Sequence, residues 1–264
     1  MSHQTTDFSI LDRPDILEII FRPWRDSPEI PPWVTLHSIP VEHGVQIACR
    51  FCVAGSQFPT ILYFHGNGET AGDYDFLAPH YHVRGMNLFV ADYRGYGLSE
   101  GRPTISNLMR DAHVIFDGLG KMLEEGGFRK SLFVMGRSLG SLSAVELAFH
   151  HQERLRGLIV ESGSANNFLS LLCLLGLPAD HPLWDEMRAF SNKVKVRSIA
   201  IPTLIIHGEY DSLISAGEGK EHYENSAAPD KSFLTIPGAD HNELLQKGIE
   251  LYFETIADFV RAHG

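Results

Sequence analysis

Residues 136–140 read Gly-Arg-Ser-Leu-Gly, a Gly-x-Ser-x-Gly pentapeptide with a single central hydroxyl, that of Ser138. A mostly apolar run, 131–135, precedes it, and a segment with apolar residues at helical spacing, 138–150, follows it. A strand that turns sharply into a helix holds its central residue in strained geometry, and the flanking glycines fit because they carry no Cβ. The hydroxyl then lies at the edge of a sheet, so we interpret Ser138 as a nucleophile.

A serine hydroxyl is a weak nucleophile at neutral pH and needs a general base, in practice a histidine, with an acid behind it. The sequence has fourteen histidines, and His241 follows the last expected strand in a loop that begins with glycine and leads into the final helix. Asp211 comes just after another expected strand. The chain order Ser138, Asp211, His241 is the one expected of a serine on such a turn. We therefore predict a Ser-His-Asp triad.

Other acids remain open at this point. Glu209 lies two residues before Asp211, and Glu161 ends an earlier expected strand, so either could stand behind the histidine. Asp211 could instead cap a helix expected to start near Ser212, because aspartate is favoured at that position. Three further residues are expected to be structural or solvent-facing rather than catalytic: His65, His207 and Asp240.

The oxyanion that develops during acyl transfer needs two hydrogen-bond donors. The first expected donor is the backbone N–H of Leu139, at the start of a helix whose dipole favours negative charge. The second is the backbone N–H of Asn67, in the glycine-rich loop 65–68 that follows the expected strand 60–64. A phosphate cradle is not expected in this loop, because no Gly-Lys-Ser/Thr follows it.

Short apolar strands alternate with amphipathic helices along most of the chain. Strands are expected at 34–39, 45–53, 60–64, 87–91, 132–135, 155–160, 203–206 and 233–236. Helices are expected at 15–21, 71–84, 105–125, 138–150, 182–196, 212–226 and 242–262. This alternation predicts an α/β fold, a mostly parallel sheet with helices on both faces. Sites in such sheets form at the carboxyl ends of the strands, where every candidate residue falls.

The sequence divides into an arm and one domain. Residues 1–33 are rich in proline and charge and read as an irregular N-terminal arm, pinned to the body by burial of Trp24 and Trp33. The domain covers 34–264, with a small cap insertion at about 164–200 placed to cover the site. Its leucine-rich segment, 168–177, could bind an apolar acyl chain or simply pack the insertion onto the core.

Composition narrows the function classes. The 264 residues suit one large α/β domain or two small ones, and 44% hydrophobic content is ordinary for a globular protein. A formal net charge of −11 argues against a nucleic-acid partner and against docking on anionic lipid through charge. We find no secretory signal and no apolar run long enough to span a bilayer, so a cytoplasmic location without a transmembrane anchor is expected.

Cys49 and Cys52 spell a C-x-x-C motif, but they lie within the expected strand 45–53. Residues three apart on a strand face opposite sides of the sheet, so the two sulfurs should diverge. A structural zinc needs about four ligands, and no second cysteine pair exists. We interpret the two as reduced cysteines that pack in the core.

Taken together, the chain from about residue 34 onward resembles the α/β-hydrolase superfamily, and within it serine hydrolases of the monoacylglycerol-lipase and protein-depalmitoylase type. The resemblance is carried by 65–68, 92–101, 136–140, Asp211 and 238–243. It implies an eight-stranded, mostly parallel sheet, hydrolysis through an acyl-serine, and no metal or organic cofactor. The chain departs from that type in having no N-terminal cysteine cluster or membrane helix and only a short insertion. Ser141 stands where many relatives have glycine.

The expected function is therefore a serine hydrolase acting on a small-molecule carboxylic ester or thioester. The first alternative is a serine peptidase, aminopeptidase-like, which reuses this fold and triad. The second is a hydrolase-like scaffold protein without activity, although such relatives typically lose the nucleophile or the base. Dehalogenase and epoxide-hydrolase chemistry is disfavoured because those relatives place aspartate where this chain has Ser138. The sequence does not indicate an oligomeric state.

Overall fold

The computed structural model describes residues 8–25, 29–167, 178, 180–181 and 183–264. Its strands are β1 (Val34–Glu42), β2 (Val45–Cys52), β3 (Thr60–Phe64), β4 (Asn87–Ala91), β5 (Leu132–Arg137), β6 (Gly157–Glu161), β7 (Thr203–Gly208) and β8 (Lys231–Ile236). Its α-helices are α1 (Pro14–Ile20), α2 (Ala78–His82), α3 (Ile105–Glu125), α4 (Ser141–His150), α6 (Leu183–Phe190), α7 (Asn192–Lys195), α8 (Ala216–Asn225) and α9 (Leu244–His263).

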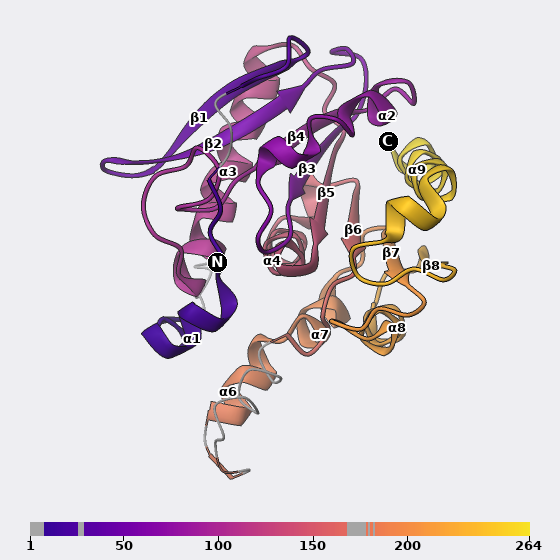
Figure 1. The fold of residues 1–264 in the computed structure, drawn as a ribbon. Helices are drawn as coiled ribbons and strands as arrows, with labels where there is room; N and C mark the ends of the chain where they lie inside the picture. The colour runs from indigo at the N-terminus through magenta and orange to yellow at the C-terminus, as the bar shows by residue number, and fades with distance from the viewer. Residues whose placement is uncertain (1–7, 26–28, 168–177, 179, 182) are drawn as a thin grey trace.

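These strands form one eight-stranded sheet in the order β1-β2-β4-β3-β5-β6-β7-β8 (Figure 1). β2 pairs antiparallel with both β1 and β4, and every pair from β4 to β8 is parallel. The sequence-based expectation of an eight-stranded, mostly parallel sheet is confirmed. In the parallel part Phe64 lies opposite Gly136, and Arg137 lies opposite Glu161, so the carboxyl ends of these strands meet at one edge.

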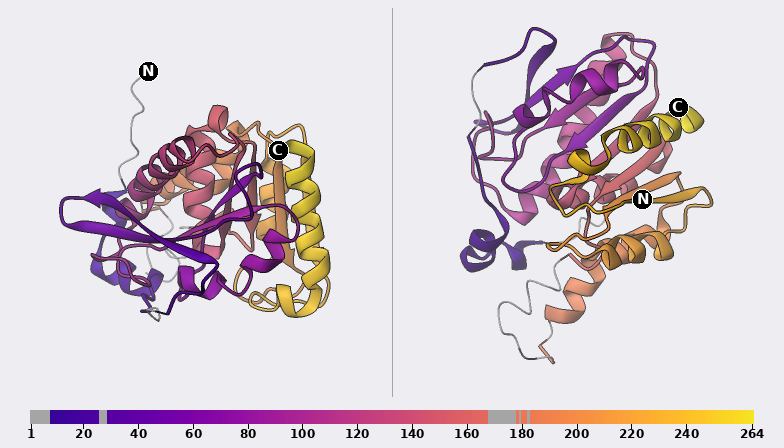
Figure 2. Two further views of the ribbon diagram at one scale, coloured as in Figure 1. Left: turned by 90° about the horizontal axis from the view of Figure 1, so that it is seen from above. Right: turned by 45° about the vertical axis from the view of Figure 1, so that its right-hand side comes forward.

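Helices cover both faces of the sheet (Figure 2). Helices α3 and α4 pack on one face, and α2 and α9 pack on the other. Each face has its own buried cluster, because the strands of the parallel part are apolar on both sides. Cys49 belongs to the first cluster and Cys52 to the second, and both are buried free thiols. The expected divergence of the two sulfurs is therefore confirmed.

The expected helix 71–84 is wrong, because the structure breaks it into a 3₁₀ turn (Ala71–Tyr74) and the short helix α2. Pro79 lies in the first turn of α2, where a backbone N–H would have no helical partner, so its absence costs nothing. In the interior of a longer helix the same proline would remove a hydrogen bond and clash with the preceding turn, so it cannot continue an earlier helix. Thr70 and Asp73 form a capping box that fixes the start of the 3₁₀ turn.

Two other helices also differ from expectation. The expected helix 212–226 begins only at Ala216, because the Asp211 carboxylate accepts hydrogen bonds from the N–H groups of Leu213 and Ile214 and holds a turn there. The expected helix 182–196 is two helices, α6 and α7, separated at Ser191, whose backbone is extended. A side chain that bonds to nearby backbone N–H groups thus delays the start of the first helix, and one residue with an extended backbone divides the second.

The N-terminal arm is held differently from the prediction. Trp24 and Trp33 are 68% and 49% exposed, so the expectation that their burial pins the arm is wrong. Phe8, Leu11 and Ile16 are buried instead and join the cluster beneath α3. The arm's aliphatic and phenyl side chains therefore supply the apolar contact.

The leucine-rich segment 168–177 lies outside the described residues, and its role as part of a cap stays a prediction. The division into an arm at 1–33 and a domain at 34–264 likewise stays a prediction. Among the described residues, no helix combines the length and the apolarity that crossing a membrane requires. The cytoplasmic location expected from the sequence is a prediction that this finding does not test.

Candidate active site

The turn that carries Ser138 is strained in the way that its sequence predicts. Ser138 has a φ of +50°, in the left-handed region that residues with a Cβ rarely adopt. A Cβ on Gly136 would overlap the carbonyl of Gly140, and one on Gly140 would overlap the carbonyl of Phe64 on β3. The two glycines therefore allow the backbone at the start of α4 to lie in close contact with the ends of β5 and β3. The turn presents Ser138 at this edge of the sheet.

Ser138, His241 and Asp211, which are far apart in the chain, converge at this edge. Ser138 Oγ lies 3.1 Å from His241 Nε2, and His241 Nδ1 lies 2.7 Å from Asp211 Oδ2. Both distances are within the range of hydrogen bonds. His241 and Asp211 are buried, with exposed fractions of 5% and 7%. A hydroxyl, an imidazole and a carboxylate in this chain of contacts can transfer a proton from the hydroxyl to the imidazole during nucleophilic attack.

The Asp211 carboxylate is held in its ionised form. Its burial alone would raise its pKa, but hydrogen bonding to His207 and His241 and from the Ile214 N–H outweighs burial and lowers the pKa. His207, buried at the end of β7, also contacts the Ile214 carbonyl at 2.8 Å, so it orients this loop as expected. Because the folded pKa lies below the ordinary value, the stabilisation from this carboxylate is present at neutral pH and is lost only in acid.

The alternative acids have other partners. Glu209 Oε2 accepts the Gly238 N–H at 2.8 Å, and Asp240 accepts the His241 N–H at 2.7 Å. Glu161 accepts hydrogen bonds from two buried tyrosines and from Arg137. Each of these carboxylates braces a loop or a strand end at the site. Among the residues that the structure describes, Asp211 alone contacts His241 Nδ1.

The two expected oxyanion donors follow adjacent strands. Leu139 comes directly after Ser138 in the 3₁₀ turn Ser138–Gly140, and Asn67 follows β3, which pairs with β5. The Asn67 side chain contacts the N-terminal arm, because its Oδ1 accepts the Arg22 N–H at 2.8 Å and its Nδ2 donates to the Ile20 carbonyl at 2.6 Å. Sequence reasoning missed this anchoring of the loop. The oxyanion role of the two backbone N–H groups stays a prediction.

The loops that follow β3 and β4 are braced by contacts near the site. His65 Nε2 lies 3.3 Å from Asp92 Oδ1, and His65 Nδ1 lies 2.7 Å from the Gly66 carbonyl. Arg94 is buried and paired with Asp111 at 2.6 Å. These contacts link the loops after β3 and β4 to α3.

Comparison with known proteins is consistent with this geometry. Residues 56–168 match a protein-family model described as "Serine aminopeptidase, S33". Alpha/beta hydrolase domain-containing protein 17B from Homo sapiens is 30% identical over 226 residues, which is 82% of this chain and 72% of that protein. The chain belongs to the α/β-hydrolase superfamily. Alpha/beta hydrolase domain-containing protein aho-3 from Caenorhabditis elegans is 31% identical over 222 residues, 81% of this chain and 61% of that protein.

A solved structure shares the fold. The esterase Pf2001 of Pyrococcus furiosus superimposes with a TM-score of 0.73 at 20% identity, over 91% of this chain and 98% of that one. The resemblance to the α/β-hydrolase superfamily and the α/β-hydrolase fold expected from the sequence are both confirmed. The chain is therefore a hydrolase by family.

Sequence reasoning also missed Arg137, the residue immediately before Ser138 in this α/β-hydrolase. Its guanidinium is buried between two carboxylates, contacting Glu161 at 3.1 Å and Glu69. Tyr63 and Tyr252 donate their hydroxyl groups to Glu161 at 2.9 and 2.7 Å. Burial alone would lower the pKa of Arg137, but the two carboxylates outweigh it and raise that pKa. A charged residue at the end of each of two neighbouring apolar strands is the sequence signal that could have found this network.

Arg137 also holds the loop that carries the histidine. Its Nη2 donates to the His241 carbonyl at 3.0 Å and to Asn242 Oδ1 at 2.8 Å. One guanidinium thus connects the backbone beside Ser138 to the backbone of His241. Because the imidazole must stay within hydrogen-bond reach of the hydroxyl, we assign Arg137 as a positioning residue.

We expect Arg137→Lys to lower the kcat of hydrolysis by about 10- to 100-fold and to change KM little, because lysine keeps the charge but cannot span both loop contacts. Steady-state kinetics measures the two constants separately, and thermal unfolding shows whether the variant is folded. Arg154→Lys, at an exposed arginine paired with Asp117, is the matched control and should behave as wild type. A wild-type kcat in Arg137→Lys would remove the positioning role.

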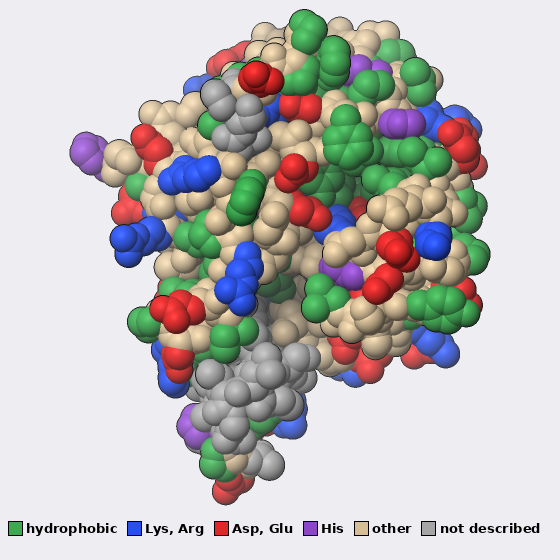
Figure 3. All heavy atoms as spheres, viewed as in Figure 1, with side chains coloured by type: hydrophobic (Ala, Val, Ile, Leu, Met, Phe, Trp, Pro, Cys, Tyr) green, Lys and Arg blue, Asp and Glu red, His purple; other side chains and the backbone are tan. Residues whose placement is uncertain are grey.

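A cavity of about 340 Å³ opens beside His241. Aromatic and aliphatic side chains form the larger share of its walls, among them Tyr74, Leu77 and Leu244, while Arg137 and Glu161 also line it. Figure 3 shows a hollow in this face of the molecule, bordered by hydrophobic side chains. The cavity offers a largely apolar surface next to His241.

Proposed function

We propose that this α/β-hydrolase is a serine hydrolase that cleaves a carboxylic ester or thioester through an acyl-serine intermediate. The observation that carries the proposal is the continuous contact from Ser138 Oγ through the His241 imidazole to the Asp211 carboxylate, at 3.1 and 2.7 Å. The strained turn at Ser138 adds support, because such strain is typical of a nucleophile presented to substrate.

In this mechanism Ser138 Oγ attacks the acyl carbon while His241 Nε2 accepts its proton. Asp211 holds the imidazole in the tautomer that accepts at Nε2, and its negative charge stabilises the imidazolium. The backbone N–H groups of Leu139 and Asn67 donate to the oxyanion. His241 then protonates the leaving alcohol or thiol. A water molecule, deprotonated by the same imidazole, then attacks the acyl carbon. The bond to Ser138 Oγ breaks, the carboxylic acid leaves, and the imidazolium returns the proton to Ser138 Oγ.

An aminopeptidase-like activity is the second candidate, favoured by the description of the family model that residues 56–168 match. A peptidase of that kind must bind a free amine next to the scissile bond, which calls for a carboxylate facing the substrate. Glu161 and Glu69 line the cavity beside His241, but both are engaged by Arg137. The esterase proposal therefore has the stronger support.

We expect the enzyme to hydrolyse p-nitrophenyl esters of medium-chain acids faster than p-nitrophenyl acetate, because an apolar chain gains free energy on burial, about 0.8 kcal/mol per CH₂. A series from acetate to decanoate, with matched acyl thioesters and aminoacyl-p-nitroanilides, measures kcat/KM for each class. The Ser138→Ala variant gives the background rate. A flat or falling chain-length profile would contradict the apolar-acyl part of the proposal, and faster cleavage of the anilides would favour the peptidase.

A further inference from the structure

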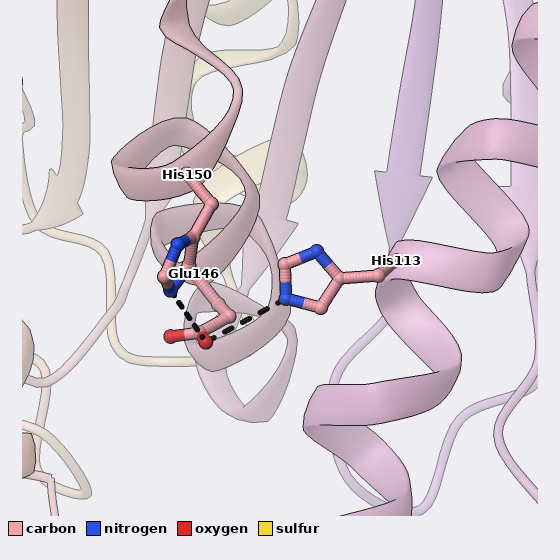
Figure 4. A group of neighbouring side chains, drawn as sticks. All are labelled: His113, Glu146 and His150. Atoms are coloured by element: carbon pink, nitrogen blue, oxygen red, sulfur yellow. Dashed lines mark ion pairs between the residues drawn. The ribbon is translucent and has the colours of Figure 1, made fainter. Parts of the chain in front are cut away.

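A second cluster of chemically capable side chains lies away from Ser138. His113 from α3 and Glu146 and His150 from α4 converge at one place between the two helices (Figure 4). Helix α4 begins at Ser141, next to the nucleophile, and ends at His150. At 1.5 Å per residue, the cluster is therefore roughly 15 Å along the helix from the triad. The proposed hydrolase mechanism uses none of these three residues.

The spacing of the three ligand atoms suits a small divalent ion. Glu146 Oε1 lies 3.2 Å from His150 Nε2 and 3.6 Å from His113 Nε2, and all three atoms lie within 4.8 Å of one another. Zn²⁺ bonds to imidazole nitrogen and carboxylate oxygen at about 2.0–2.2 Å, which places neighbouring ligands of a tetrahedron about 3.4 Å apart. Two of the three edges already have that length.

The contacts around the cluster are those that metal ligands need. His113 Nδ1 lies 2.8 Å from His151 Nε2, so the second ring nitrogen of His113 has a partner while Nε2 faces Glu146. Glu146 Oε2 accepts a hydrogen bond from the ammonium of Lys195, which orients the carboxylate and leaves Oε1 facing the two imidazoles. Lys195 thus balances the charge of Glu146 at Oε2, and the two imidazole nitrogens lie at the other oxygen, Oε1.

An ion can also reach the cluster. Glu146 is buried at 5% side-chain exposure, whereas the side chains of His113 and His150 are 31% and 17% exposed. The carboxylate thus lies on the buried side of the cluster and the two imidazoles lie on its solvent side. A water molecule can reach an ion there and act as its fourth ligand. Two nitrogens and one oxygen from neutral imidazoles and a carboxylate form a donor set that Zn²⁺ binds well.

We propose that His113, Glu146 and His150 form a Zn²⁺ site that ties α3 to α4. The ion would cross-link two helices that cover the same face of the sheet, held by three protein ligands with water in the fourth position. The positive charge of Lys195 opposes the ion, so we expect a dissociation constant in the micromolar range. The proposal is independent of the hydrolase mechanism, which needs no metal.

Titration calorimetry with Zn²⁺ alone tests the site. Wild type should bind one ion per chain, and His113→Gln and His150→Gln should each weaken that binding on the order of 100-fold or more. His43→Gln, at an exposed histidine in the turn between β1 and β2, is the matched control and should bind as wild type. Zn²⁺ should also raise the unfolding temperature of wild type and of His43→Gln, but not of the two cluster variants.

Co²⁺ in place of Zn²⁺ gives a direct readout of geometry, because tetrahedral Co²⁺ absorbs strongly in the visible range. Wild type should show these bands, and they should be lost in His150→Gln. The partly exposed positions of His113 and His150 favour folded variants, and circular dichroism checks this. Absence of saturable Zn²⁺ binding to wild type, or equal affinity in wild type and both cluster variants, would overturn the site.

Discussion

Ser138→Ala is expected to lower kcat for ester hydrolysis by about 10⁴-fold or more, because alanine has no oxygen that can form the acyl intermediate. Alanine tolerates the strained backbone of the turn no worse than serine, so the variant should fold as wild type does. Stopped assays with the preferred p-nitrophenyl ester measure the rate. Labelling with a fluorophosphonate probe, which reacts covalently with activated serines, gives an independent readout and should disappear in the variant.

The matched control is Ser131→Ala, at a buried serine just before the other end of β5. It removes a buried hydroxyl six residues before Arg137, at the opposite end of the same strand from Ser138, and should leave both the rate and the labelling unchanged. If Ser138→Ala kept its fluorophosphonate labelling, the reactive serine would lie elsewhere. If labelling were lost but hydrolysis persisted, the measured activity would not pass through an acyl-serine.

Asp211→Asn is expected to lower kcat by about 10³- to 10⁴-fold with the fold intact. The asparagine amide can occupy the same place, but it cannot both keep the His241 tautomer that accepts the Ser138 proton and stabilise the imidazolium by charge. The Asp211 carboxylate is ionised at neutral pH, since hydrogen bonding with His207 and His241 and from the Ile214 N–H lowers its pKa despite burial. Steady-state kinetics on the preferred ester measures the loss.

Glu209→Gln is the matched control for this change, because it neutralises a carboxylate two residues away on the same loop. Glu209 is exposed and contacts the Gly238 N–H rather than the imidazole, so its variant should stay close to the wild-type rate. A large loss in Glu209→Gln together with a small loss in Asp211→Asn would reverse the assignment of the acid. Comparable small losses in both variants would mean that His241 works without a carboxylate partner.

The strands and their mostly parallel sheet could be predicted in outline because the strands are short, apolar and separated by amphipathic segments. The β3, β4, β5 and β6 strands are buried on both faces, and such runs are conspicuous in a sequence. The bounds of the helices were harder to predict wherever a local contact competed with the periodic pattern of apolar residues. The Asp211 side chain holds a turn where the pattern favours a helix, and Pro79 divides another expected helix.

The expectation about the tryptophans failed for a different reason. Large aromatic side chains usually gain free energy on burial, but whether a cavity exists for them depends on elements elsewhere in the chain. In the structure the arm places Phe8, Leu11 and Ile16 against the core and leaves Trp24 outside. The sequence of the arm alone therefore does not predict which of its apolar side chains are buried, because the surface that the arm packs against is formed by other parts of the chain.

The sequence by itself determined the strained turn at Ser138, because its requirements are local: a glycine two residues before and two residues after Ser138, between a strand and a helix. It also indicated His241 and Asp211 from their places after strands, since the carboxyl ends of parallel strands meet at one edge. Only the tertiary structure decided which carboxylate faces the imidazole and which arginine holds the histidine loop. It also decided that His113 meets Glu146 and His150 across two helices. Such contacts join residues distant in the chain, and they depend on register and helix packing, which local sequence patterns do not encode.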